Sequence, residues 1–245
     1  MDRLIYIAMT GAKHVLYSQA VTTNNIANAT TDGFKSQISA FRALPVYGEG
    51  APTRAFVVES TPGSDYSPGA IMSTGRQMDV AIRGKGWIAV QGADSKEAYT
   101  RNGSLQTDVN GVLQINGMNV LGDGGPISVP PDNEVAIAKD GTISTIPVNG
   151  VRTSVNVIGR LKLVNPPESD LVRGDDGLFR QANGRPAPVD EKIQVASGSL
   201  EASNVNMAEA MVNMISDARQ YDMQLRLITR ADENARSAAQ VVSIS

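Results

Sequence analysis

The first apolar positions of the chain recur at the spacing of one helix face. Steps of three and four residues alternate, and five of the seven positions are apolar: Ile5, Ala8, Ala12, Val15, Gln19, Thr22 and Ile26. The segment then runs into "NNIANATTDGFK", where Asn28 tolerates a left-handed conformation and Asp32-Gly33 supplies a turn. The pattern predicts a helix that ends near Asn28.

The last segment carries the strongest periodic pattern. Asn206, with Glu209 three residues later, has the form of a capping box. A heptad with a single charged position follows, at Met207, Met211, Met214, Ala218, Tyr221, Leu225, Ile228, Asp232, Ala235, Ala239 and Val242. This heptad predicts a coiled-coil seam. A second apolar patch is expected off the seam, at Val212, Met223 and Leu227.

Between the helices the pattern changes twice. The residues from 31 to 76 contain scattered glycines and four prolines, Pro45, Pro52, Pro62 and Pro68. Prolines forbid a long helix and discourage a central strand, so we expect an irregular extended connector there. A short apolar piece such as "AFVVES" fits that connector better than a core strand.

From 77 to 197 the pattern indicates short β-strands. Strand-like runs are "DVAI", "GWIAV", "GVLQI", "EVAIA" and "VIGRLKLV". Turn dipeptides separate them, at Asn102-Gly103, Asn110-Gly111, Asn116-Gly117, Asp140-Gly141, Asn149-Gly150, Asp176-Gly177 and Asn183-Gly184. These features predict a compact antiparallel β domain.

The expected fold class is therefore α+β. We expect an N-terminal helix over 1–30, an irregular extended connector over 31–76, a β-rich outer domain over 77–197 and a C-terminal helix over 198–245. The two helices would pair with each other as a coiled coil, and the second apolar patch would contact other molecules.

Composition removes several classes of function. The formal net charge of −3 offers no basic surface for nucleic acid. The chain has no cysteine and one histidine, which excludes disulfides and thiolate or multi-histidine metal sites. No apolar run approaches the roughly 20 residues that cross a bilayer, and the start lacks the form of a cleaved secretory signal. We expect no cofactor, no nucleic-acid partner and no direct membrane insertion.

No catalytic constellation is evident. His14 has no serine and carboxylate nearby in sequence, and a surface or interface role suits it better. Asp175-Asp176 lies in a turn and Asp232-Glu233 on an exposed helix face, which explains both acidic pairs without catalysis.

Four stretches resemble one family. "AMTGA", "NNIANATTDGFK", "TGRQMDVAIRGKGWIAVQ" and "GSLEASNVNMAEAMVNMI" are similar to motifs of the axial proteins of the bacterial flagellum, the rod and hook components. The resemblance covers essentially the whole chain in the family's order. Within the family, Trp87-Ile88 resembles the proximal-rod members, because distal-rod relatives usually have an aromatic pair there.

The resemblance implies a non-enzymatic structural subunit of the basal-body rod, which transmits torque across the periplasm. Its partners would be proximal and distal rod subunits, further copies of itself and the flagellar type III export apparatus, through which it would be exported to the basal body without a cleaved signal. The expected assembly and coiled-coil residues are Leu4, Ile5, Ala8, Ala12, Val15, Asn24, Asn25, Ile26, Asn28, Gly33, Phe34, Met207, Met211, Met214, Ala218, Tyr221, Leu225 and Ile228.

Three alternatives remain open at this point. A distal-rod or hook-type subunit shares the assembly logic and differs in its neighbours. An adhesin-like surface fibre shares it too. A carbohydrate-active or proteolytic β enzyme with helical ends would need convergent acids in a cleft, and the sequence offers no convincing set.

Overall fold

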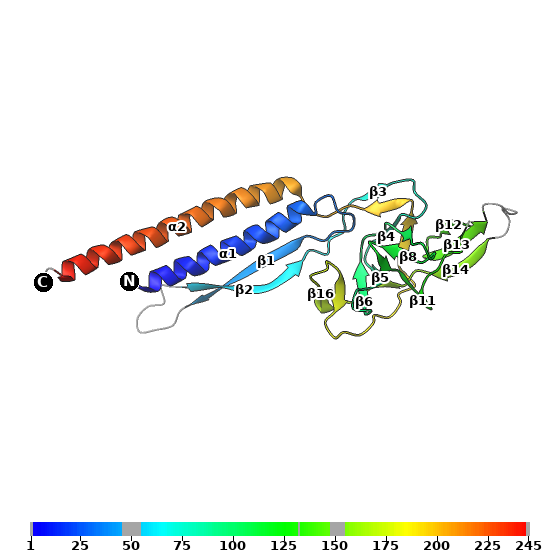
Figure 1. Cartoon of the computed structure of the whole chain (residues 1–245), viewed down its shortest axis with the longest axis horizontal. Helices are drawn as coiled ribbons and strands as arrows, with labels where there is room; N and C mark the ends of the chain where they lie inside the picture. Colours follow the sequence, from blue (N-terminus) through cyan, green and yellow to red (C-terminus); the bar gives the residue numbers. More distant parts are fainter. Residues whose placement is uncertain (1, 46–54, 132, 148–154, 244–245) are drawn as a thin grey trace. The chain divides into compact units, whose positions relative to one another are not determined.

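The computed structural model describes residues 2–45, 55–131, 133–147 and 155–243 (Figure 1). These residues form two compact units. The helix unit comprises residues 1–29, 36–65 and 205–245, and the β unit comprises residues 30–35 and 66–204. The chain therefore passes between the units four times, and each unit is built from segments that are distant in sequence.

Two antiparallel helices dominate the helix unit. Helix α1 (Asp2–Ala27) lies antiparallel beside α2 (Met207–Ser243), and the C-terminal end of α2 extends past the start of α1 (Figure 1). Helix α1 ends one residue before the predicted position, where the backbone N–H of Asn28 donates to the carbonyl of Asn24 at 3.1 Å. The predicted cap of α2 is confirmed, because Asn206 Oδ1 accepts the backbone N–H of Glu209 at 3.3 Å.

The expectation of an irregular connector is wrong for residues 37–64. They form an antiparallel ribbon of β1 (Gln37–Pro45) and β2 (Ala55–Ser64), which also contacts α1. Pro62 does not prevent pairing, because the register shifts beside it, between Ile38 paired with Gly63 and Ala40 paired with Ser60. Both strands of a two-stranded ribbon are edge strands, and a bulge in an edge strand tolerates proline.

The described residues of the β unit form short antiparallel strands and a 3₁₀ turn, η1 (Glu168–Asp170). A five-stranded sheet has the order β15-β5-β6-β17-β16, and two three-stranded sheets have the orders β12-β13-β14 and β7-β8-β9. Three pairs complete the unit, β4 with β18, β3 with β19 and β10 with β11. The strands are β3 (Ile71–Ser73), β4 (Val80–Arg83), β5 (Trp87–Gln91), β6 (Glu97–Thr100), β7 (Gln106–Thr107), β8 (Leu113–Ile115), β9 (Met118–Asn119), β10 (Leu121–Gly122), β11 (Gly125–Pro126), β12 (Asn133–Ile137), β13 (Thr142–Pro147), β14 (Asn156–Arg160), β15 (Leu163–Val164), β16 (Leu171–Arg173), β17 (Phe179–Gln181), β18 (Gln194–Ser197) and β19 (Ser199–Glu201).

The predicted antiparallel β domain is confirmed, with three differences of detail. The run "VIGRLKLV" forms two strands, β14 and β15, instead of one. Strand β19 lies within the range expected for the last helix, so that helix begins at Met207. Gly103 is not at a hairpin turn, because the strands before and after it, β6 and β7, belong to different sheets. A Cβ at Gly103 would lie 1.6 Å from the carbonyl oxygen of Val80, so only glycine fits there. Asn149-Gly150 lies outside the described residues.

Strand β5 has a core on each of its faces. Ile88 and Val90 belong to a large apolar cluster with residues of β4, β8, β12 and β13, whereas Trp87 and Ala89 belong to a second cluster that includes Tyr99 and Phe179. Alternate side chains of a strand point to opposite faces. The unbroken apolar run "WIAV" is therefore what a strand buried on both faces requires.

Candidate functional site

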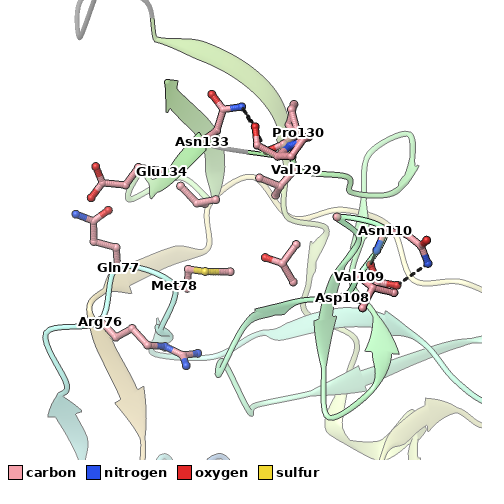
Figure 2. Close-up of a pocket in the computed structure, with 14 residues that line it drawn as sticks. Arg76, Gln77, Met78, Asp108, Val109, Asn110, Val129, Pro130, Asn133 and Glu134 are labelled. Carbon is pink, nitrogen blue, oxygen red and sulfur yellow. Dashed lines mark hydrogen bonds between the residues drawn. The ribbon is translucent and has the colours of Figure 1, made fainter. Parts of the chain in front are cut away.

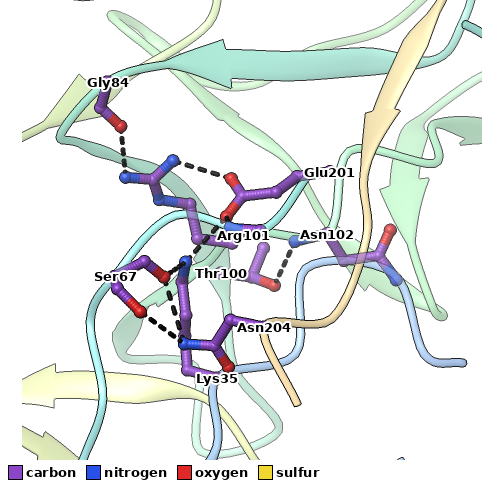
Figure 3. A network of polar contacts seen from close by, with 9 residues as sticks. Lys35, Ser67, Gly84, Thr100, Arg101, Asn102, Glu201 and Asn204 are labelled. Carbon is purple, nitrogen blue, oxygen red and sulfur yellow. Dashed lines mark hydrogen bonds and ion pairs between the residues drawn. The ribbon is translucent and has the colours of Figure 1, made fainter. Parts of the chain in front are cut away.

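A buried group of charged residues lies where the chain enters and leaves the β unit. We call Lys35, Ser67, Arg101, Glu201 and Asn204 the junction cluster (Figure 3). Glu201 Oε1 accepts a hydrogen bond from the Lys35 ammonium group at 2.7 Å, and Glu201 Oε2 accepts one from Arg101 Nη1 at 2.8 Å. The side chains of Lys35, Arg101 and Glu201 are 0%, 4% and 1% exposed. One carboxylate thus serves two cations away from solvent.

Two further donors of this cluster bind backbone carbonyls. Lys35 Nζ also donates to the carbonyl of Ser67 at 2.8 Å, and Arg101 Nη2 donates to the carbonyl of Gly84 at 2.6 Å. Burial lowers the pKa of Arg101, and the neighbouring Glu201 carboxylate opposes that shift. Loss of one partner from a buried ion pair is costly, because the other charge is left without compensation. The cluster is therefore a strong structural constraint.

Three segments next to the passages between the units meet at this cluster. The backbone N–H of Gly33 donates to the carbonyl of Glu201 at 2.7 Å, and that of Gly69 donates to Glu201 Oε1 at 2.9 Å. Asn204 Nδ2 donates to the carbonyl of Ser67 at 3.1 Å. Residues 30–35, 66–70 and 201–204 are thereby fastened to one place on the β unit.

Gly33 and Phe34, expected as assembly residues, are instead packed within the β unit. Gly33 has a φ of +69°, and a Cβ there would lie 2.2 Å from the backbone nitrogen of Asn102, so a side chain does not fit. Phe34 is buried, with the Arg173 guanidinium 4.5 Å from its ring centroid. Both residues thus have contacts within the β unit of the single chain, and their part in assembly stays a prediction.

The predicted helix face of α1 is covered in the structure. Ala8, Ala12 and Thr22 are buried, and Ile5, Val15, Gln19 and Ile26 are partly buried. The side chain of Leu4 lies outside the described part. A complementary set of exposed positions, which we call the α1 outer stripe, also recurs in steps of three and four: Tyr6, Met9, Lys13, Leu16, Ala20, Thr23 and Ala27.

The predicted seam of α2 needs a correction. The positions that are covered recur at a different heptad phase, namely Met207, Ala210, Met214, Asp217, Tyr221, Gln224, Ile228 and Ala231. Four of these match the expected seam, but Met211, Ala218 and Leu225 are exposed. Their expected packing against α1 is therefore wrong for the single chain. The small and polar covered positions suit the close approach of α1, where Gln224 lies against Gly11.

The asparagines at the end of α1 have mostly local roles. Asn25 Nδ2 donates to the carbonyl of Gln37 at 2.9 Å, and its Oδ1 accepts the backbone N–H of Gln37 at 2.8 Å. Asn28 Nδ2 donates to the carbonyl of Asn24 at 2.9 Å. Asn25 thus holds the start of β1 against α1. The side chain of Asn24 is exposed.

An open pocket of about 670 Å³ lies on the β unit beside a turn that presents Val109 to solvent (Figure 2). Hydrogen bonds from the backbone N–H of Val112, then of Asn110, lower the pKa of Asp108 in this turn. Arg76 at the pocket wall pairs with Asp79 at 2.9 Å. The acidic groups among the lining residues are thus Glu134 and an Asp108 already bonded within its own turn, which is not a convergent catalytic pair.

The geometry is that of a structural subunit, with a firmly closed β unit and two helices that present apolar stripes. Family comparisons match three parts of the chain. The three matching families are described as flagella basal body rod protein (residues 5–35), flagellar hook protein FlgE/F/G D1 domain (residues 81–145) and flagellar basal body rod FlgEFG protein C-terminal (residues 196–241). Lys35, Arg101 and Glu201 each lie in one of these regions.

Relatives that match the chain over almost its whole length point to the same family. Flagellar basal-body rod protein FlgF of Escherichia coli (strain K12) is 48% identical, and that of Salmonella typhimurium (strain LT2) is 47% identical, each with 100% of both chains covered. FlgG of Buchnera aphidicola subsp. Schizaphis graminum is 31% identical over 97% of this chain and 98% of its own.

The chain belongs to the flagellar basal-body rod protein family, and the resemblance stated from the sequence is confirmed. It is a structural rod protein and not an enzyme. Proteins of this family are located in the basal body. Among the described residues, no helix combines the length and the apolar character needed to cross a membrane.

Proposed function

We propose that this subunit assembles into the rod through its two terminal helices and carries torque across the periplasm as part of the drive shaft. Helices α1 and α2 pair as a coiled coil that forms an inner layer, and their exposed stripes contact neighbours. The neighbours are other rod subunits, proximal and distal, and further copies of this chain. Many small packed contacts, rather than any single residue, bear the load.

The α1 outer stripe is the observation that carries this proposal. Tyr6, Met9 and Leu16 are 60%, 54% and 47% exposed, and they lie in line along one face of α1. A helix that belongs to a solitary protein keeps such an apolar line against its own core. Apolar side chains left outside in a regular line are typical of an interaction surface.

The covered positions of α2 support the coiled-coil pairing. From Met207 to Ala231 they recur without interruption in steps of three and four. This is the periodicity that keeps a seam facing a partner helix over several heptads. The exposed residues of α2 then remain available to contact other subunits.

We also propose export through the flagellar type III apparatus without cleavage of an N-terminal signal. Ile5, Ala8 and Ala12 support this part, because they belong to the covered face of α1. A cleaved leader could not contribute residues to the packed helix pair. Mass spectrometry of the subunit recovered from basal bodies should therefore show residues 2–12 intact, and their loss would contradict uncleaved export.

The assembly proposal is tested by Leu16→Asp, introduced into a strain that lacks its own copy of the gene. A charge in an apolar interface is costly to desolvate, so we expect motility and recovery of the subunit in purified basal bodies to fall about tenfold or more. Gln106→Asp, at an exposed polar position of the β unit, is the control and should leave both unchanged. Normal incorporation of Leu16→Asp at wild-type cellular level would contradict assembly through this stripe.

A further inference from the structure

Helix α1 contains one glycine, Gly11, within the stretch "AMTGA". Glycine is a poor helix former, so a glycine in the interior of a helix indicates a packing requirement. A Cβ at Gly11 would lie 3.0 Å from Cδ and from Nε2 of Gln224, and 3.2 Å from its Oε1. Both residues belong to the covered faces of their helices. The amide end of Gln224 therefore lies in a notch that the missing side chain of Gly11 leaves open.

This contact fixes the level of α1 relative to α2 within one chain. Covered positions recur every seven residues on both helices, so Ser18 follows Gly11 on α1 and Asp217 precedes Gln224 on α2. In an antiparallel pair, Ser18 and Asp217 therefore lie at one level, which brings two polar residues together. Both residues are partly buried, and Oδ2 of Asp217 is fully buried. One register thus suits two successive layers of the helix pair.

The large covered residues of α2 do not define this level by themselves. They repeat every seven residues, at Met207, Met214, Tyr221 and Ile228. A shift of α1 by one heptad therefore leaves large residues at the same places along the seam. Such a shift places Gly11 at the level of Asp217 or of Ala231, depending on its direction. In neither case does Gln224 meet a glycine, so the notch distinguishes the observed register from its neighbours.

We infer, on the basis of the proposed assembly through the terminal helices, that Gly11 and Gln224 form a register lock. The side chain of Gln224 in the notch over Gly11 selects one axial position of α1 against α2. It thereby sets the axial position of the α1 outer stripe relative to the exposed residues of α2. A one-heptad shift would move the stripe by about 10 Å along the axis. A neighbour that contacts both helices at once requires the correct register.

An engineered disulfide reports the register, because the chain has no cysteine of its own. Ser18→Cys together with Asp217→Cys should form a disulfide within the oxidised full-length chain, since the two positions lie at one level. Ser18→Cys with Ser216→Cys, whose second cysteine lies on an exposed face of α2, is the control and should form little. Peptide mass spectrometry of the digested, non-reduced chain measures the disulfide fraction.

An exchange of side-chain volume between the two helices tests the lock. Gly11→Leu fills the notch, so the disulfide fraction of the reporter should fall about tenfold. Gln224→Ala combined with Gly11→Leu makes room for the leucine and should return the fraction to within about threefold of the parent reporter. Gln224→Ala alone empties the notch and removes the preference for one level, so the fraction should fall about threefold.

Matched controls separate the lock from general effects on the helices. Ala20→Leu and Gln220→Ala make similar changes at exposed positions of α1 and α2, and neither should alter the disulfide fraction. Circular dichroism checks the helix content of every variant. Gln224→Ala introduces no steric conflict, so it tests the lock even if Gly11→Leu does not fold.

The same variants without the added cysteines test the link to assembly. In the strain that lacks its own copy of the gene, Gly11→Leu should reduce incorporation into purified basal bodies about tenfold. The double variant with Gln224→Ala should recover to within about threefold of wild type.

The outcomes separate this inference from the proposed function. An unchanged disulfide fraction in both single variants, or no recovery in the double variant, would overturn the register lock. Normal incorporation of a Gly11→Leu subunit whose disulfide fraction has fallen would overturn the role of the lock in assembly. In each of these cases Leu16→Asp still decides whether the α1 outer stripe mediates assembly at all.

Discussion

The β unit buries its apolar residues far more completely than the helix unit does. Leu113, Ile115 and Ile143 have no exposed surface in the β unit, whereas buried positions in α2 are small, such as Ala210 and Ala231. Several larger apolar residues of α2, including Met211 and Leu225, are exposed. The chain therefore separates two tasks: the β unit supplies stability in the single chain, and the helices keep apolar surface available for contacts with other molecules.

The largest effect is expected from Glu201→Ala in the junction cluster. This variant leaves Lys35 and Arg101 buried without their shared carboxylate, so unfolding of the β unit should become easier by about 3–5 kcal/mol. Glu168→Ala is the control, because Glu168 pairs with Lys85 at the surface and its loss should cost about 1 kcal/mol or less. Denaturant titration followed by Trp87 fluorescence measures both, and equal effects would mean that the junction cluster is not a strong constraint.

A pair of leucine truncations compares the two units directly. Leu113→Ala opens a cavity in a closed core and should cost about 2–5 kcal/mol. Leu225→Ala removes a side chain that is 43% exposed, and should cost well under about 1 kcal/mol. Thermal unfolding of each purified variant gives the comparison. A large loss for Leu225→Ala in a verified monomer would show that α2 buries this residue against its own chain.

Tyr99 gives the β unit an alkaline limit. Burial is the main cause that raises its pKa from 10.0 to about 12, and its hydroxyl oxygen accepts the backbone N–H of Ala187 at 2.8 Å. The unfolded chain releases the phenolic proton near pH 10 and the folded protein near pH 12. Stability from this group is thus complete below pH 10 and declines as pH rises toward 12.

Tyr99→Phe tests this dependence. It should flatten the fall in stability between pH 10 and pH 12 and cost about 1 kcal/mol at pH 7, because the hydrogen bond to Ala187 is lost. Chemical denaturation at a series of pH values provides the measurement. An unchanged alkaline slope in the variant would assign the loss to other groups.

The sequence pattern predicted the helices and most strands well, but it predicted poorly which residues of α2 face α1. The prediction from the heptad pattern assumes that the most apolar face of a helix packs against a partner helix of the same chain. That assumption holds for α1, where Ala8 and Ala12 are covered. It is wrong for α2, because Ala210 and Gln224 occupy the covered phase while Met211 lies outside. A chain that leaves apolar residues exposed breaks the rule on which the prediction depends.

The junction cluster could not be predicted, because it depends on contacts across long stretches of chain. Lys35 and Glu201 are 166 positions apart, and no periodicity relates them. The sequence did contain one signal: a charged residue follows an apolar one in both "DGFK" and "GSLE", inside two of the motifs that resemble the family. The sequence did not predict the ribbon of β1 and β2 for a different reason. Its prolines discourage central strands, but edge strands tolerate them.

The smallest effect is expected at the start of α2, where Asn206 caps the helix. Asn206→Ala removes the acceptor for the backbone N–H of Glu209, which should cost about 1 kcal/mol and fray the first turn. Asn213→Ala makes the same chemical change at an exposed interior position and should be neutral or slightly stabilising, because alanine favours helix. Residue-resolved hydrogen exchange should show faster exchange over residues 207–211 in Asn206→Ala alone, with protection of Ile88 and Leu113 unchanged. If exchange in those β-unit strands rose as well, the two regions would share one cooperative unit, and the division of tasks between them would have to be abandoned.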